Sequence, residues 1–194
     1  MSDDVIKHST EDLLHLPAAG LKAGLSPALE KIGRYGIGKL LEESPDFLAR
    51  LLGKLKHADA AGLFSEVPGA ADQLTALLWE GVAFRAGQSR DMKSLLENAE
   101  RDFHGNIEAS DSPFRTHFIM EKGKIRGGSG LLHFKDEDFR FMGPTEVLLD
   151  LLTGDLALGL GNLRLQTAGH PGWTARLVPV MREIGKMIKG ADLG

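Results

Sequence analysis

Residues 114–125 read FRTHFIMEKGKI, and this stretch decides the fold class. Its first part alternates, with Phe118 and Met120 on one face and His117 and Ile119 on the other, which is the period of a β-strand. The sequence Lys122-Gly123-Lys124 predicts a hairpin turn. A second strand is therefore expected from residue 125 to residue 135. The run GGSG at 127–130 predicts a bulge in that strand, or a close backbone approach.

Toward the C-terminus the pattern alternates between strands and helices. The acidic turn at 136–138 leads into FRFM at 139–142, which predicts another strand. A helix is expected to open at Gly143-Pro144 and to close at Gly154, because leucines fill the interval. Residues 162–167 alternate again, and the last helix follows Pro171-Gly172. This order predicts an α+β fold with a mostly antiparallel sheet.

The N-terminal half has helical periodicity throughout. One helix is predicted from residue 47 to residue 56, with Ser44 as its cap, a second after Pro68-Gly69, and a third from residue 89 or 90 to about residue 101. Residues 16–41 are rich in glycine, which predicts broken helices. The period changes to two at residue 103. We expect a helical N-terminal region at 1–90 and a second domain at 91–194.

The second domain, over about residues 103–188, resembles the sterol carrier protein 2 (SCP2) family of lipid-binding domains. The resemblance rests on the Lys-Gly-Lys hairpin, on PTEVLLDLLTGD at 144–155, on a variable apolar segment at 156–160, and on GNLRLQTAG at 161–169 leading into the last helix. It implies a five-stranded sheet covered by helices that enclose an apolar tunnel for acyl chains or sterols. It implies no catalytic residues, and residues 1–100 have no counterpart in the minimal domain.

The candidate lipid-binding residues are apolar side chains expected on the inward face of the sheet and on one face of each covering helix. They are Phe118, Met120, Phe134, Phe139, Phe141, Leu148, Leu152, Leu163, Leu165, Trp173, Leu177, Met181 and Ile184. Methionine side chains suit a surface that must fit varied apolar ligands. The alternative is that the same side chains simply fill a core.

These observations lead to a functional hypothesis of non-catalytic binding or transfer of long-chain apolar lipids, such as a fatty acid, a fatty acyl-CoA or a sterol-like molecule. An alternative is an accessory or scaffold protein that presents a lipid-like intermediate, such as a quinone precursor, to partner enzymes through the N-terminal helices. A third interpretation is an enzyme that uses His117, His133 or His170.

Composition argues against several other classes. The chain has 23 basic and 27 acidic residues, a net charge of -4, which gives no electrostatic basis for nucleic-acid binding. It contains no cysteine, which excludes thiolate metal sites and cysteine nucleophiles. The sequence GRYGIGK at 33–39 has the spacing of a phosphate-binding loop, but Leu40 stands where serine or threonine is required. We therefore expect no cofactor.

We also expect no metal, since His117 and His133 would need Glu121 or Glu137 to complete a site. Residues 47–56 place Arg50, Lys54 and Lys56 opposite a leucine face. Such a helix either makes transient contact with an anionic membrane surface or packs its leucines against the rest of the protein, and packing is favoured. No apolar run reaches the roughly 18 residues of a membrane span, and the N-terminus is acidic, so a cytoplasmic location is expected.

Overall fold

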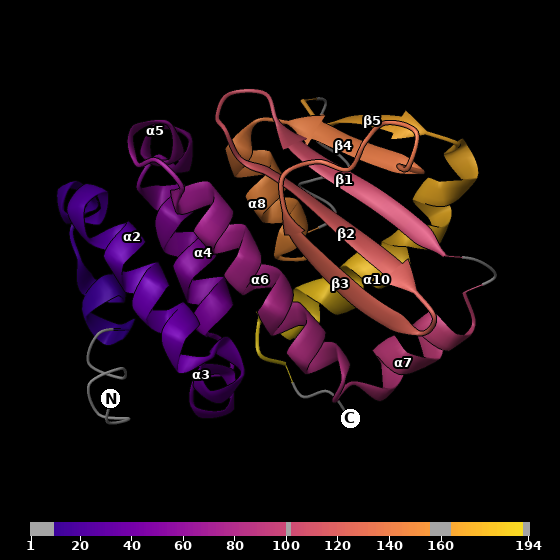
Figure 1. Ribbon diagram of the computed structural model, residues 1–194, viewed down its shortest axis with the longest axis horizontal. Coiled ribbons are helices and arrows are strands. Elements are labelled where there is room, and N and C mark those ends of the chain that lie inside the picture. Colours follow the sequence, from indigo (N-terminus) through magenta and orange to yellow (C-terminus); the bar gives the residue numbers. More distant parts are fainter. Residues whose placement is uncertain (1–9, 100–101, 156–163, 192–194) are drawn as a thin grey trace.

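A five-stranded sheet with the order β3-β2-β1-β4-β5 forms one half of the molecule (Figure 1). The computed structural model describes residues 10–99, 102–155 and 164–191. The strands are β1 (Phe103–Ala109), β2 (Arg115–Glu121), β3 (Lys124–Ser129), β4 (Phe139–Gly143) and β5 (Gln166–Gly169). Pairing is antiparallel except between β1 and β4, which are parallel. The predicted α+β class and the mostly antiparallel, helix-covered sheet are confirmed.

The hairpin between β2 and β3 forms where the sequence predicts it. Lys122 and Gly123 have φ values of 51° and 73°, the left-handed conformations of a two-residue hairpin turn that matches strand twist. The ladder continues from Glu121 opposite Lys124 to Thr116 opposite Ser129, so the predicted bulge is wrong. The predicted close approach is confirmed instead, because a Cβ atom on Gly127 would lie 2.5 Å from the ring of Trp79.

Two strand boundaries and one whole strand differ from the prediction. β3 ends at Ser129, so residues 131–135 are not part of the sheet. β1 was not predicted as a strand, although it lies at the centre of the sheet, because glycine, asparagine and glutamate in FHGNIEA lower its apparent β-propensity. β5 begins at Gln166, later than predicted.

The helices follow the predicted periodicity. They are α2 (Ala18–Tyr35), α3 (Ile37–Glu43), α4 (Phe47–His57), α5 (Ala60–Glu66), α6 (Ala70–Ala86), α7 (Arg90–Glu97), α8 (Thr145–Leu152) and α10 (Pro171–Ile188). The predicted break falls at Gly36, whose φ of 98° ends α2. Asp46, rather than Ser44, precedes the first residue of α4, and the Ser44 hydroxyl donates to the Asp46 carboxylate at 3.3 Å.

Helix α6 joins the N-terminal helices to the sheet (Figure 1). On one side, Gly81 leaves room for Leu48, which would lie 2.9 Å from an added Cβ atom. On the other side, Trp79 donates its Nε1–H to the Thr116 hydroxyl at 2.6 Å and stacks on Phe118 with ring centroids 5.5 Å apart. Buried side chains from both halves therefore form one continuous cluster. The division into two domains at residue 90 stays a prediction. The buried cluster contains residues from both sides of that boundary.

Candidate apolar ligand site

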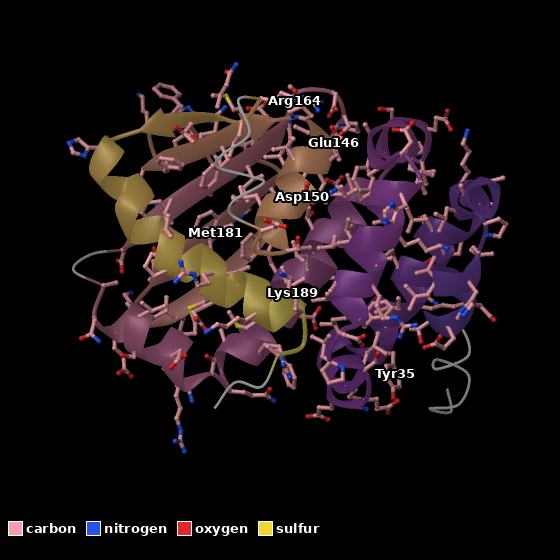
Figure 2. All side chains as sticks on the ribbon, turned by 180° about the vertical axis from the view of Figure 1, so that it is seen from behind. Tyr35, Glu146, Asp150, Arg164, Met181 and Lys189 are labelled. Atoms are coloured by element: carbon pink, nitrogen blue, oxygen red, sulfur yellow. The ribbon has the colours of Figure 1, made fainter. Side chains whose placement is uncertain are left out.

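The sheet has an apolar face that the helices cover. The registers place Phe118 and Phe139 on either side of Gly105, and Thr116 and Phe141 on either side of Ile107, so these side chains share one face. Figure 1 shows α8 and α10 behind the sheet, and Figure 2 shows the same layer from the helix side, with Met181 on α10. This is the region where the sequence predicts a lipid tunnel.

Most of the predicted lipid-binding residues lie in this layer. At most 2% of the surface is exposed on Phe118, Phe139, Phe141, Leu148, Leu152, Leu177, Met181 and Ile184. Met120 is 8% exposed, and Leu165 is half-buried against the core. Phe134 is the correction: it lies beyond the end of β3 and is 65% exposed, so it cannot line the covered face. Leu163 and the side chain of Trp173 lie outside the described residues.

Side chains fill the layer between α6 and the sheet. Trp79 stacks on Phe118, and Phe118 stacks on Phe103 with centroids 5.7 Å apart. Gly105 makes this possible, since a Cβ atom there would lie 2.5 Å from the Phe118 ring. A tunnel wide enough for an acyl chain would leave exposed surface on the residues that line it. In this conformation the layer is packed as a core, and direct ligand contact by these residues stays a prediction.

Two adjoining open clefts lie where the β2–β3 hairpin meets α7. Both are lined by Leu96 of α7 and by Gly123 of the hairpin turn. The first, which we call the lysine cleft, has a volume of about 390 Å³. The second, the acidic cleft, has a volume of about 570 Å³. Both volumes fall within the range typical of small-molecule sites.

The lysine cleft combines an apolar floor with two cations. Its apolar lining comes from α6, α7 and the β2–β3 hairpin, which are separate in the sequence. The lining residues other than lysine are Ala83, Ala86, Gly87, Leu96, Gly123 and Ile125. Lys93 of α7 and Lys124 of β3 complete the lining, and no carboxylate takes part. Neither lysine forms an ion pair with another residue in the described ranges. A cap bond from the Met92 N–H to the Ser89 hydroxyl, 3.1 Å long, fixes the start of α7 and hence the position of Lys93.

The acidic cleft has the opposite character. Glu97, Asp102 and Glu121 line it, with Lys122 as its one lysine. The Lys122 backbone N–H donates to Asp102 at 3.2 Å. A hydrogen bond from Arg126 at 2.8 Å lowers the pKa of Glu121, against the opposing effect of burial, and His104 at 3.3 Å lowers it further. Glu121 therefore remains ionised at neutral pH, so this cleft disfavours an anion that the lysine cleft attracts.

Met120 is the one predicted site residue that lines either cleft. The sequence predicts only that the α6 and α7 residues of the clefts lie on helices. It predicts only that the hairpin lysines belong to a turn. The available signal was the pair of lysines flanking Gly123, which alternation along a hairpin places at its solvent-exposed tip. Contact between this turn and α7 follows from tertiary packing alone.

The three histidines of the enzyme interpretation lie on separate elements. His117 contacts the Gly130 carbonyl through Nδ1 at 3.1 Å, and the His133 ring packs against Phe134 with centroids 4.6 Å apart. His170 accepts a hydrogen bond from the Gly172 N–H at the start of α10. Placing His133 on a strand was wrong. Across residues 10–99, 102–155 and 164–191, no group of three or more histidine and acidic side chains is arranged to hold a metal.

Helix α4 packs its leucine face inward, as the favoured alternative predicted. Phe47, Leu48, Leu51, Leu52 and Leu55 are all at most 1% exposed. Two of its basic residues pair with acids from other segments: Arg50 pairs with Glu11 at 3.2 Å, and Lys56 pairs with Asp150 of α8 at 2.6 Å. No described helix combines the length and apolar character needed to cross a membrane.

Comparisons with known proteins add a remote structural similarity. No protein-family model and no curated protein sequence matches the chain. Among solved structures, sterol carrier protein 2 from Yarrowia lipolytica in its apo form is similar at a TM-score of 0.40 and 13% identity, over 63% of this chain and 95% of that one. A similarity of this extent assigns neither a family nor a ligand.

Proposed function

We propose that the protein binds a long-chain lipid with an anionic end group, such as a fatty acid, and acts without catalysing a reaction on it. The lysine cleft carries this proposal, because its lining joins an apolar floor to two lysines and includes no carboxylate. The anionic end would lie between Lys93 and Lys124, and the chain would lie along Ala86, Leu96 and Ile125. Burying a chain on these residues supplies affinity, and the lysines supply orientation.

The contrast between the two clefts supports the choice of an anion. They share Leu96 and Gly123, and each has further apolar residues: Ala99 and Met120 in the acidic cleft, and Ala83, Ala86 and Ile125 in the lysine cleft. Their charges differ, since carboxylates line only the acidic cleft. A ligand with an anionic end is therefore expected to select the lysine cleft. Presentation of such a ligand to partner enzymes stays a prediction.

The test is a fluorescence titration with dansyl-labelled undecanoate and its uncharged methyl ester. The acid should bind the wild type more tightly than the ester does, and Lys93→Glu combined with Lys124→Glu should weaken the acid about tenfold or more, equivalent to about 1.4 kcal/mol. Lys122→Gln is the matched control, because Lys122 belongs to the same turn but lines the acidic cleft. Equal binding of acid and ester, or no binding of either, would overturn the proposal.

A further inference from the structure

The exposed ring of Phe134 stands on the face of the sheet opposite the helices. Figure 1 shows the segment between β3 and β4 crossing the front of the sheet, while α8 and α10 lie behind it. Phe134 is 65% exposed, and it is the one large apolar side chain in the described part of the chain to be exposed. The sequence predicts that Phe134 lines a tunnel, but its ring faces solvent and is free to contact another surface.

The segment that carries Phe134 is held firmly at its base. Asn106 of β1 is fully buried and clamps Leu132, since its Nδ2 donates to the Leu132 carbonyl at 3.2 Å and its Oδ1 accepts from the Leu132 N–H at 2.8 Å. Asp138 exchanges two bonds with the backbone of His104, at 2.8 and 3.0 Å. The ring is therefore presented on a fixed platform, which reduces the entropy lost when it binds a surface.

One cation and one imidazole lie beside the Phe134 ring. The Lys135 ammonium lies 5.8 Å from the centroid of Phe134, and the His133 ring packs against it. Two of the three acids nearby face the sheet: Glu137 binds Arg140 at 2.9 Å, and Asp138 binds His104. Asp136 is the remaining exposed acid. An aromatic ring with a lysine beside it suits the boundary between acyl chains and phosphates.

We propose that Phe134 inserts into the surface of a phospholipid bilayer, with Lys135 at the level of the phosphates. A bilayer is favoured over a protein partner because Phe134 is the one exposed large apolar side chain in the described part of the chain, whereas a protein interface needs a broad apolar patch. One ring and one cation give weak, reversible association. The proposal does not rest on the lysine cleft, which lies at the hairpin end of the sheet.

The test is co-sedimentation of the full chain with phosphatidylcholine vesicles, with and without phosphatidylglycerol. Phe134→Ala should lower the partition coefficient about tenfold or more, as expected for one buried aromatic ring. Lys135→Gln should weaken binding only where phosphatidylglycerol is present, and Asp136→Asn should strengthen it there. In Phe134→Trp, brominated lipids should quench fluorescence beyond the quenching of the wild type.

Tyr35 provides a matched control. It is an aromatic residue with Lys39 5.6 Å from its ring centroid, and it lies on α2 in the N-terminal helices (Figure 2). Tyr35→Ala should leave vesicle binding unchanged. The proposal is overturned if the wild type binds neither vesicle, or if Phe134→Ala binds as well as the wild type. It is also overturned if Phe134→Ala abolishes self-association in sedimentation velocity without changing vesicle binding, since the ring would then contact a second copy. Failure of fatty-acid binding would leave all these results intact.

Discussion

Replacing Met181 with tryptophan distinguishes a filled layer from a lipid tunnel. Met181 is 1% exposed, and its neighbours on the same face of α10, Leu177 and Ile184, are 2% and 0% exposed. A larger side chain therefore has no void to enter, and overpacking should lower the free energy of unfolding by about 1–3 kcal/mol. For a chain of this length each kcal/mol corresponds to about 2–4 °C, so the midpoint of thermal unfolding should fall by about 2–12 °C.

The assay is thermal and urea unfolding followed by circular dichroism, with Arg182→Trp as the control. Arg182 is exposed on the same helix, so the same new side chain should cost little there. The dansyl-undecanoate titration is repeated on both variants, and Met181→Trp should retain the affinity of the wild type for the lysine cleft. The filled-layer interpretation is refuted if Met181→Trp is as stable as the wild type but binds the probe more weakly, because the tryptophan would then occupy a space that the lipid uses.

Three further changes probe the packing and the charges. Trp79→Phe keeps an aromatic ring over Phe118 but removes the donor to Thr116, and it should lower the free energy of unfolding by about 1–3 kcal/mol in urea titrations; an unchanged midpoint would contradict the role of this bond. Gly185→Ala places a Cβ atom 2.8 Å from the Gly154 nitrogen and should cost on the order of 1–3 kcal/mol, while Gly53→Ala, with nothing within 4 Å, should not destabilise. The pKa of Glu121 is lowered from 4.5 in the folded state, so its contribution is present above pH 4.5 and is lost as the pH falls through the folded value. Wild type and Glu121→Gln should therefore differ in stability at pH 7 and converge in acid, and a difference that grows in acid would show that the sign is wrong.

The sequence predicts well those features that a local pattern specifies. Alternation in FRTHFIM, together with Lys122 and Gly123, is enough for the β2–β3 hairpin, because both positive φ values fall on the turn itself. Leucine spacing is enough for α4, whose whole apolar face is buried. The central strand β1 escapes prediction for the opposite reason. Gly105 makes room for the ring of Phe118, and Asn106 binds the backbone of Leu132, both distant in sequence. Glycine and asparagine have low β-propensity, so the local sequence does not predict a strand here.

The candidate site is harder to predict than the fold, because apolar side chains look alike in a core and in a cavity. The alternation that places Phe118 on the inward face says nothing of Trp79, which occupies the space beside it from a helix earlier in the chain. Conversely, the register of β3 places Ile125 and Gly127 on the inward face, so alternation continued to Phe134 would put it on the opposite face. The strand also ends before that point, since Gly130, with a φ of 77°, follows its last residue. The charge contrast between the two clefts depends on which side of the hairpin each lysine faces, and this is a property of tertiary structure.

The two-sided burial of α6 has a consequence for how the chain is made. The N-terminus leaves the ribosome first, so α6 is complete before Thr116 and Gly127 have been synthesised. The side of α6 that faces α3 and α4 can pack against them as soon as it is synthesised. Trp79 can pack only after β2 and β3 have been synthesised. During that interval the nascent chain exposes an indole ring with no partner, which is the kind of surface that chaperones bind. A protein truncated after α7 would expose it permanently, and should self-associate more readily than the full chain.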